Sequence, residues 1–349
     1  MDQKFKEERF FYTKNNHFKW GYKHKPFSWS SSNGSNWNSF GDLCYPGGTT
    51  EFSSRHSETD EFYVQYGKCS RKPRRFLHEC VRTANEIYFA IQNLKYQFYK
   101  DWVKPGIKFE INILLSGGID SEIVARSFLL ARKPFKCIIY RFNDDINLHD
   151  ICYAISFCET YEIDYEIIDI NIHNFFKSSS KKNEFRYKVF DYGFKGQCVS
   201  PQLSTILYMA DQVRGIPIIG SGECYLQKEN GSWFLYEQEK VASLYKYFWL
   251  TKEPAIPGFF QWNPEIMLSF LEDKMIQDLV KSDKNSSKEI KFDFYKKHFP
   301  DIVPRKKYTG FEKIMDLDKE VRNVLNYFPL HSNEVAKTEY NELINILKK

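Results

Sequence analysis

The length, composition and charge of the chain limit the class of protein. Its 349 residues are enough for one large domain or two, and a hydrophobic content of 42% is that of a globular protein. A net charge of +5 suits anionic ligands but is too small to indicate nucleic acid as a partner. No apolar run approaches the ~20 residues that span a bilayer, and the charged start has no apolar signal region. We therefore expect a cytoplasmic protein without a membrane partner.

The cysteines give no sign of a metal site or of a disulfide framework. The eight are scattered, none forms C-x-x-C, and no His lies at zinc spacing. This arrangement predicts a reducing compartment and no structural zinc. Cys137, Cys152 and Cys158 stand within apolar patterns and are expected to be buried thiols.

The first 75 residues differ from the rest. They mix aromatic residues with Ser, Asn and Gly and have few segments with a clean period. We expect residues 1–75 to form an irregular segment whose aromatic side chains pack on the main domain or on a partner. Residues 76–102 then carry apolar residues at helical spacing, which predicts an amphipathic helix or helix pair ending at Lys104-Pro105-Gly106.

The most informative stretch covers residues 109–128. An apolar run from Phe109 to Leu115 predicts a buried strand, and helical spacing resumes from Ser121. Between them lies the hexapeptide SGGIDS, residues 116–121. Its glycines let backbone N–H groups approach an oxyanion, and the helix start adds unpaired donors and the positive end of the helix dipole. The stretch therefore predicts a phosphate site.

The side chains of this hexapeptide allow two interpretations. Asp120 would repel a phosphate unless a divalent cation lay between them, which makes it a candidate Mg²⁺ ligand. The alternative is an ordinary strand-to-helix turn, with Gly for the bend and Ser or Asp as the N-cap. On the first interpretation the nucleotide-binding residues are Leu115, Ser116, Gly117, Gly118, Asp120 and Ser121.

The hexapeptide excludes one phosphate-binding motif and resembles another. No Lys follows the glycines, so the Walker A pattern is absent. The six residues resemble the pyrophosphate loop, Ser-Gly-Gly-x-Asp-Ser, of the N-type ATP pyrophosphatase (PP-loop) superfamily, and the chain resembles the asparagine synthetase C-terminal domain in particular. The resemblance implies an adenine nucleotide alpha hydrolase-like fold of the HUP type. It also implies ATP and Mg²⁺ as cofactors, and attack on the α-phosphate that yields an adenylate and pyrophosphate.

Strands and helices alternate after the hexapeptide. Residues 135–142 and 165–172 predict strands, and residues 148–161 and 201–214 predict helices. This order predicts an α/β fold with a parallel, doubly wound sheet, whose ligands bind beyond the carboxyl ends of the strands. The polar stretch 177–198 predicts a surface loop or lid.

The end of the second strand is where the resemblance places adenine. It implies contacts at Tyr140 and Arg141, largely through the backbone. Alternatively, Arg141 pairs with Asp144 or Asp145 at the surface. The residues themselves do not decide between these two interpretations.

A second strand-and-turn motif occupies residues 216–223. An apolar strand leads into Ser221, Gly222 and Glu223, which match the first three positions of the Ser-Gly-Glu-Gly-x-Asp-Glu motif of asparagine synthetases. The resemblance implies nucleotide contacts for Ser221 and Gly222. It implies for Glu223 a carboxylate that takes a proton from an attacking amine, because ammonium must lose a proton to attack. The alternative is a turn with an exposed acid.

The second half of that motif is missing. Leu226 and Gln227 stand where the family has Asp and Glu, and the family's Asp is implied to help hold Mg²⁺. Asp120 is then the one clear metal ligand in the sequence, with Glu229 or Glu239 as candidate replacements.

The rest of the chain is expected to be mainly helical. Residues 241–250 and 264–280 carry helical patterning, and residues 312–349 predict one or two charged helices. Residues 281–291 are rich in Lys, Ser and Asp and are expected to be solvated.

Two features concern the chemistry that follows adenylation. Arg305 and Lys307 fit the Arg-x-Lys spacing of asparagine synthetases, which implies cations that neutralise the pyrophosphate leaving group; a basic surface cluster is the alternative. Glutamine-dependent asparagine synthetases begin with a Cys nucleophile, whereas residue 2 here is Asp2. We therefore expect ammonia to be free or to be delivered by a separate amidotransferase chain.

These observations predict three regions and one leading function. The regions are the irregular segment 1–75, an ATP-binding α/β core at 76–230 and a mainly helical part at 231–349. The expected activity is that of an AMP-forming ligase, which adenylates a small carboxylate substrate, releases pyrophosphate and forms an amide with ammonia or an amine. The alternatives are a nucleobase- or tRNA-modifying PP-loop enzyme, and a catalytically lapsed nucleotide-binding or structural protein.

Overall fold

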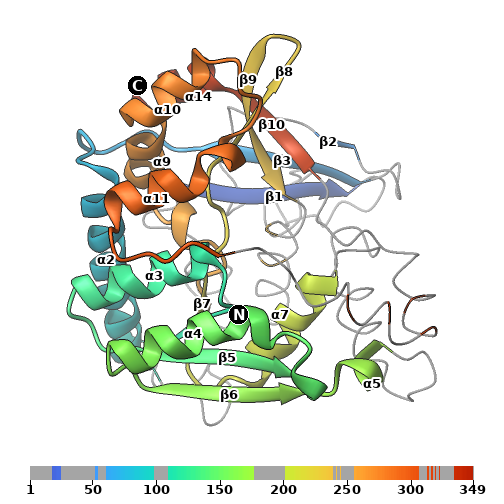
Figure 1. Ribbon diagram of the computed structural model, residues 1–349. Helices are drawn as coiled ribbons and strands as arrows, with labels where there is room; N and C mark the ends of the chain where they lie inside the picture. Colours follow the sequence, from blue (N-terminus) through green and yellow to red (C-terminus); the bar gives the residue numbers. More distant parts are fainter. Residues whose placement is uncertain are drawn as a thin grey trace.

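The computed structural model describes the greater part of the chain. It covers residues 18–24, 52–53, 60–97, 109–176, 201–238, 255–305 and 334–348, with single positions at 241, 244, 313, 316, 319 and 322. The strands within these residues form three sheets (Figure 1). The predicted loop at 177–198 lies outside the described residues.

A four-stranded parallel sheet confirms the predicted α/β class. Its strands are β4 (Ile111–Leu114), β5 (Lys136–Phe142), β6 (Tyr165–Ile170) and β7 (Ile216–Ile219). They are ordered β6-β5-β4-β7. The chain runs outward from β4 to β6 and then returns to the other side of β4. The winding therefore changes direction between β4 and β7, which is where open α/β sheets bind their ligands.

Helices cover both faces of this sheet, which explains the continuous apolar runs of its strands. Alternate residues of β4 point to opposite faces. Ile111 and Ile113 join a core with residues of α2, α3 and α4, whereas Leu114 joins a second core with residues of α5 and α7. The helices are α2 (Phe76–Gln97), α3 (Ile119–Leu130), α4 (Leu148–Thr160), α5 (Ile172–Phe176) and α7 (Pro201–Gln212).

An antiparallel sheet in the C-terminal half adds strands to the region that was expected to be mainly helical. Its strands are β8 (Tyr225–Glu229), β9 (Ser232–Gln238) and β10 (Glu334–Glu339), ordered β10-β9-β8. Asn230 and Gly231 both have positive φ, 50° and 84°, as a two-residue hairpin turn of type I′ requires. This Asn-Gly pair was a readable turn signal. Of the predicted helices at 312–349, α14 (Tyr340–Lys348) follows β10, and positions 313, 316, 319 and 322 are helical.

The N-terminal region is less irregular than predicted. It holds a small antiparallel sheet ordered β1-β3-β2, and the remainder of residues 1–59 lies outside the described residues. Phe18, Trp20 and Tyr22 alternate with Lys or Gly, a period of two that the loop-like composition around them obscures. The strands are β1 (Phe18–His24), β2 (Phe52–Ser53) and β3 (Asp60–Tyr66).

Short helices follow the central sheet. The single helix expected at 264–280 is two helices, because Asp273 interrupts it and accepts a hydrogen bond from the Met275 backbone N–H at 2.9 Å. Asn263 caps the first of them in the same way, through the Ile266 N–H at 3.0 Å. The elements are η2 (Asn143–Asp145), η5 (Phe259–Gln261), α9 (Pro264–Leu271), α10 (Lys274–Val280), η6 (Ser287–Glu289) and α11 (Lys291–His298).

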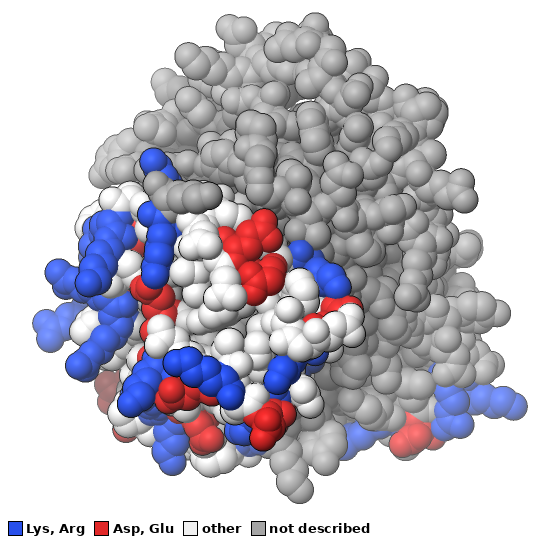
Figure 2. Space-filling model, turned by 90° about the horizontal axis from the view of Figure 1, so that it is seen from above, with Lys and Arg blue, Asp and Glu red and all other residues white. Residues whose placement is uncertain are grey.

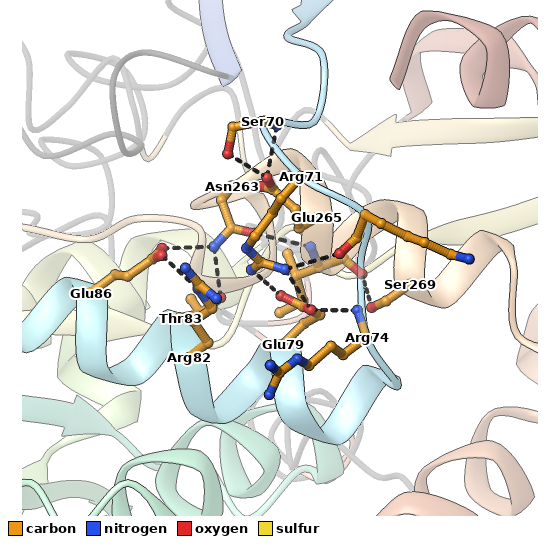
Figure 3. A network of polar contacts seen from close by, with 12 residues as sticks. Ser70, Arg71, Arg74, Glu79, Arg82, Thr83, Glu86, Asn263, Glu265 and Ser269 are labelled. Atoms are coloured by element: carbon orange, nitrogen blue, oxygen red, sulfur yellow. Dashed lines mark hydrogen bonds and ion pairs between the residues drawn. The ribbon is translucent and has the colours of Figure 1, made fainter. Parts of the chain in front are cut away.

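A network of buried polar groups ties the start of α2 to the start of α9 (Figure 3). Glu79 accepts hydrogen bonds from Arg71 Nη1 at 2.8 Å and from the Arg74 backbone N–H at 2.6 Å. Glu265 accepts from both the backbone N–H and the hydroxyl of Ser70, each at 2.8 Å. Burial alone would raise the pKa of Glu79, but the donors from Arg71 and Arg74 hold that pKa below its ordinary value. The network therefore links the segment that precedes α2 both to the first turn of α2 and to the first turn of α9.

Two of the three cysteines expected to be buried are buried. Cys137 and Cys158 are fully enclosed, but Cys152 is exposed. The buried residues of α4 are Ile151, Ala154, Phe157 and Cys158, a stripe at helical spacing that Cys152 does not share.

The helices of the described residues are short or polar, and the charges on one face of the molecule are mixed. No helix in the described segments is both long and apolar enough to cross a bilayer. On the face shown in Figure 2, basic and acidic side chains of the described residues are interspersed.

Candidate functional site

Two glycine-containing loops meet at the switch point of the parallel sheet. Leu114 and Ile219 are paired at the carboxyl ends of β4 and β7, and the hexapeptide 116–121 and the turn 220–223 follow them directly. A Cβ placed on Gly220 would lie 2.8 Å from Cα of Ser121, so the two backbones touch. Two motifs that are about a hundred residues apart in the sequence therefore form one site.

The first glycine of the hexapeptide has a conformation that other residues rarely adopt. Gly117 has φ of +86°, and a Cβ there would lie 2.1 Å from the Asp150 carbonyl oxygen. Gly118 has an ordinary extended conformation, φ −71° and ψ 153°, and serves as the N-cap residue of α3. The loop thus brings backbone N–H groups to the start of a twelve-residue helix, as an anion site requires.

The two serines of the hexapeptide close this loop. The Ser121 hydroxyl donates to the Gly118 carbonyl at 2.9 Å and accepts from the Ser116 N–H at 3.2 Å. The Ser116 hydroxyl accepts from the Gly118 N–H at 3.2 Å. Two N–H groups predicted to bind phosphate therefore donate to hydroxyls, which hold the loop in shape. Their binding to phosphate stays a prediction.

A lysine joins the acidic residues of the two loops. Lys291, the first residue of α11, donates to Asp120 Oδ2 at 2.7 Å and to Glu223 Oε1 at 3.4 Å. The Tyr295 hydroxyl, one turn further along α11, donates to Asp120 Oδ1 at 2.9 Å. The side chains of Asp120, Glu223 and Lys291 are 17%, 23% and 26% exposed, so this cluster is partly open to solvent.

The surroundings of this cluster shift the pKa values of Lys291 and Tyr295. Burial alone would lower the pKa of Lys291, but the carboxylates of Asp120 and Glu223 outweigh it and raise that pKa above its usual range. Burial and the same two carboxylates raise the pKa of the Tyr295 phenol. The site therefore holds an ammonium group between two acids, with a neutral phenol beside them.

Lys291 is the residue that the sequence did not reveal. It ends the stretch 281–291 that we expected to be solvated, but its side chain is only 26% exposed and two carboxylates hold it. The one local signal was the spacing of Lys291 and Tyr295, which places them on the same face of a helix.

The turn 220–223 packs against Gln261, which is bonded to the buried carboxyl group of Glu237. Gly222 has φ of +80°, and a Cβ there would lie 2.5 Å from Cδ of Gln261. Gln261 donates to Glu237 Oε2 at 3.0 Å, and the Tyr66 hydroxyl donates to Glu237 Oε1 at 2.9 Å. Burial raises the pKa of Glu237 to about 8. Ser221, predicted to contact the nucleotide, is buried in the same turn.

Arg305 reaches the hexapeptide, whereas Lys307 lies outside the described residues. Arg305 Nη1 donates to the Gly117 carbonyl at 2.6 Å, and Nη2 pairs with Glu122. Its guanidinium also lies over the ring of Tyr153, 4.6 Å from the centroid. Glu122 is shared with Arg126, at 2.7 Å. Arg305 is thus placed to hold the loop, and its role toward a leaving group stays a prediction.

The strand end assigned to adenine is already occupied by a side chain of the protein. β5 continues beyond the end of β4, so no strand of the described residues lies beside the Tyr140 carbonyl and the Phe142 N–H on that side. Asn147 fills both positions: its amide donates to the Tyr140 carbonyl at 3.1 Å and accepts from the Phe142 N–H at 2.8 Å. Adenine contacts at Tyr140 and Arg141 stay a prediction.

The Arg141 side chain points away from this edge. It pairs with Asp169 of β6, at 2.6 Å and 3.1 Å, on an exposed part of the sheet. The alternative partners considered from the sequence, Asp144 and Asp145, follow it in η2, where both have positive φ. The local sequence does not point to Asp169, because that residue is distant in the sequence and its position depends on the pairing of β5 with β6.

The residues present do not fit a divalent metal held by the protein alone. Both oxygens of Asp120 already accept hydrogen bonds, from Lys291 and Tyr295. Leu226 is fully buried in β8, and Glu229, a candidate replacement, pairs with Lys337 and Tyr236 beside the hairpin turn. Glu239 lies outside the described residues. Within the described segments, no group of three or more His, Cys, Asp or Glu residues could hold a metal.

Comparisons with known proteins give no assignment. No protein-family model and no curated protein sequence matches the chain. Among solved structures, the chain is similar to NMN synthetase from Francisella tularensis, with 14% identity, a TM-score of 0.28, and coverage of 72% of this chain and 87% of that one. This similarity is too distant to assign a fold family or an activity, so the residues described above carry the functional argument.

Proposed function

We propose that the protein is an ATP-dependent adenylating enzyme of the PP-loop type. The observation that carries the proposal is the convergence of the hexapeptide 116–121 and the turn 220–223 at the switch point, where Gly220 touches Ser121 and Lys291 joins their acids. Each motif alone is compatible with an ordinary turn. Their contact at the position where α/β sheets bind ligands favours a shared ligand.

In this proposal the triphosphate of ATP lies on the hexapeptide and the start of α3. Backbone N–H groups and the helix dipole stabilise its negative charge, and Arg305 keeps the loop in shape through the Gly117 carbonyl. Leu115, Ser221 and Gly222 border the nucleotide, and Lys307 follows in the segment after Arg305. Mg²⁺ is not assigned to Asp120; ATP commonly carries its own divalent cation on its phosphates.

The proposed reaction has two steps. A carboxylate oxygen of the substrate bonds to the α-phosphorus of ATP while the bond from that phosphorus to the bridging oxygen breaks, which gives an acyl-adenylate and pyrophosphate. Ammonia or an amine then bonds to the acyl carbon, AMP leaves, and Glu223 takes the surplus proton. A separate amidotransferase chain is a candidate source of the ammonia.

Product analysis tests this function. The full chain is incubated with ATP, ammonium and a panel of amino acids and other small carboxylic acids, and the nucleotides are separated by chromatography. We expect AMP and pyrophosphate in equal amounts with one class of acid. Formation of ADP and phosphate would contradict the proposal.

One rival is favoured by specific residues. Leu226 and Gln227 replace the second half of the motif, and Gln227 lies in β8 bonded to the Tyr225 hydroxyl. These replacements favour a catalytically lapsed nucleotide-binding protein. ATP binding by calorimetry without AMP formation on any acid of the panel would support this rival.

A further inference from the structure

The ammonium group of Lys291 lies beside Asp120, at the position that the sequence assigned to Mg²⁺. Asp120 follows the cap residue of α3 by two positions, beside the proposed phosphate site. Its two oxygens accept from Lys291 at 2.7 Å and from Tyr295 at 2.9 Å. A divalent cation would have to remove the ammonium from Asp120 and would then lie close to it, and two cations repel strongly at such a distance.

We propose that the ammonium of Lys291 is the resident cation of this site and binds the phosphate groups of the ligand directly, in place of a metal held by Asp120. This inference rests on the proposed function, because it concerns the same phosphate site. It assigns the phosphate-binding charge to α11, a helix that the sequence motifs did not include.

The geometry of Lys291 suits this role. An ammonium group has three donors, and the carboxylates of Asp120 and Glu223 use two of them. The two acids come from different loops, so together they hold the lysine where those loops meet. The side chain of Lys291 is 26% exposed, so the protein does not enclose it completely. Asp120 lies in the first turn of α3, and the N-terminus of that helix favours an anion nearby.

The first test measures binding of inorganic pyrophosphate to the full chain by calorimetry, in buffer with a chelator to remove divalent cations. We expect wild-type protein to bind, and Lys291→Met to bind at least about 30-fold more weakly, as loss of a charge-assisted contact implies. Lys296→Met is the matched control, because Lys296 is exposed on the same helix and lies over the ring of Phe292. Binding that requires added Mg²⁺, or that Lys291→Met leaves unchanged, would overturn the inference.

The second test asks whether Lys291 excludes a metal from the two acids. Mn²⁺ binding is followed by electron paramagnetic resonance without nucleotide. We expect no binding at this site in wild-type protein, a new site in Lys291→Met, and its loss in Asp120→Asn/Lys291→Met. A wild-type Mn²⁺ site that disappears in Asp120→Asn would contradict the inference.

If Lys291→Met fails to fold, Lys291→Arg replaces it in the pyrophosphate measurement. This variant keeps the positive charge and should retain pyrophosphate binding. Loss of that binding in the folded Lys291→Arg variant would contradict a role that needs only the charge.

The two proposals fail in distinguishable ways. If wild-type protein binds neither ATP nor pyrophosphate under any condition, the proposed function fails, and the phosphate-binding role of Lys291 fails with it. If wild-type protein binds pyrophosphate only with Mg²⁺, the proposed function survives and the role of Lys291 alone is refuted.

Discussion

The α2–α9 network and the switch-point site both contain acidic side chains that are largely buried, but different groups hold them. Glu79 and Glu265 accept hydrogen bonds from backbone N–H groups as well as from side chains. The contacts described for Asp120 and Glu223 come from side chains of α11. A side chain can rotate to admit a ligand, whereas a backbone N–H moves only with its chain segment. The first cluster is therefore suited to holding helices together and the second to exchanging partners.

The largest effect is expected from breaking the first cluster. Glu79→Ala leaves Arg71 and the Arg74 N–H without a buried acceptor, and we expect a loss of about 3–5 kcal/mol in the free energy of unfolding. Urea unfolding followed by circular dichroism measures it. Asp120→Asn is the matched change in the second cluster and should cost about 1 kcal/mol or less, because Lys291 keeps Glu223. Equal losses would show that the two clusters do not differ in this way.

The pH dependence of stability should distinguish another buried acid, Glu237, from the acids of both clusters. Its pKa in the fold is about 8, raised by burial from 4.5. Between these two pH values the unfolded chain has lost the proton and the folded protein keeps it, so stability falls as pH rises through this window. The fall should be about 4 kcal/mol across this window. Glu237→Gln cannot ionise and should flatten the profile measured by denaturant unfolding from pH 5 to pH 8; parallel profiles would contradict the assignment.

A smaller effect should distinguish the two glycines of the hexapeptide. Gly117→Ala places a Cβ 2.1 Å from a backbone carbonyl oxygen at a positive φ, and we expect it to cost about 1–3 kcal/mol and to weaken ATP binding. Gly118→Ala meets the flexible Ser116 hydroxyl at 3.2 Å, at an ordinary φ, and should be close to wild type in stability. Thermal unfolding and calorimetry with ATP compare the pair. If both variants behaved alike, the shape of the loop would not depend on Gly117.

The smallest effect is expected at Arg141. Its ion pair with Asp169 is exposed, and exposed pairs contribute little because water and salt screen them. Arg141→Ala should leave the unfolding curve unchanged within error and should not alter ATP affinity in calorimetry. A clear loss of ATP affinity would instead support the nucleotide contact that the resemblance implied for Arg141.

The parallel sheet and the two loops could be predicted from the sequence because their signals are local. An apolar run followed by Gly and Ser marks both β4 and β7, and the helical patterns between them imply parallel strands. The small sheets were missed although their signals were also present: alternation at Phe18, Trp20 and Tyr22, and the Asn230-Gly231 turn. The loop-like composition of residues 1–75 obscures the first of these signals, and the helical patterning of the C-terminal region obscures the second.

Lys291 could not be found in the same way. It is separated from Asp120 by 171 positions, and the two meet only because α11 docks against the start of α3. The residues before it have the composition of a solvated segment. Nothing local distinguishes this lysine from its neighbours except Tyr295 one turn later, so its place depends on tertiary packing.

The long separation between the two loops and α11 has a consequence for the growing chain. Domains form from the N-terminus as synthesis proceeds, so a nascent chain that has reached Glu223 already contains both loops while α11 has yet to be made. During that interval the two acids face each other without Lys291, and the repulsion between them disfavours the closed arrangement. The site therefore cannot be completed until α11 has been synthesised.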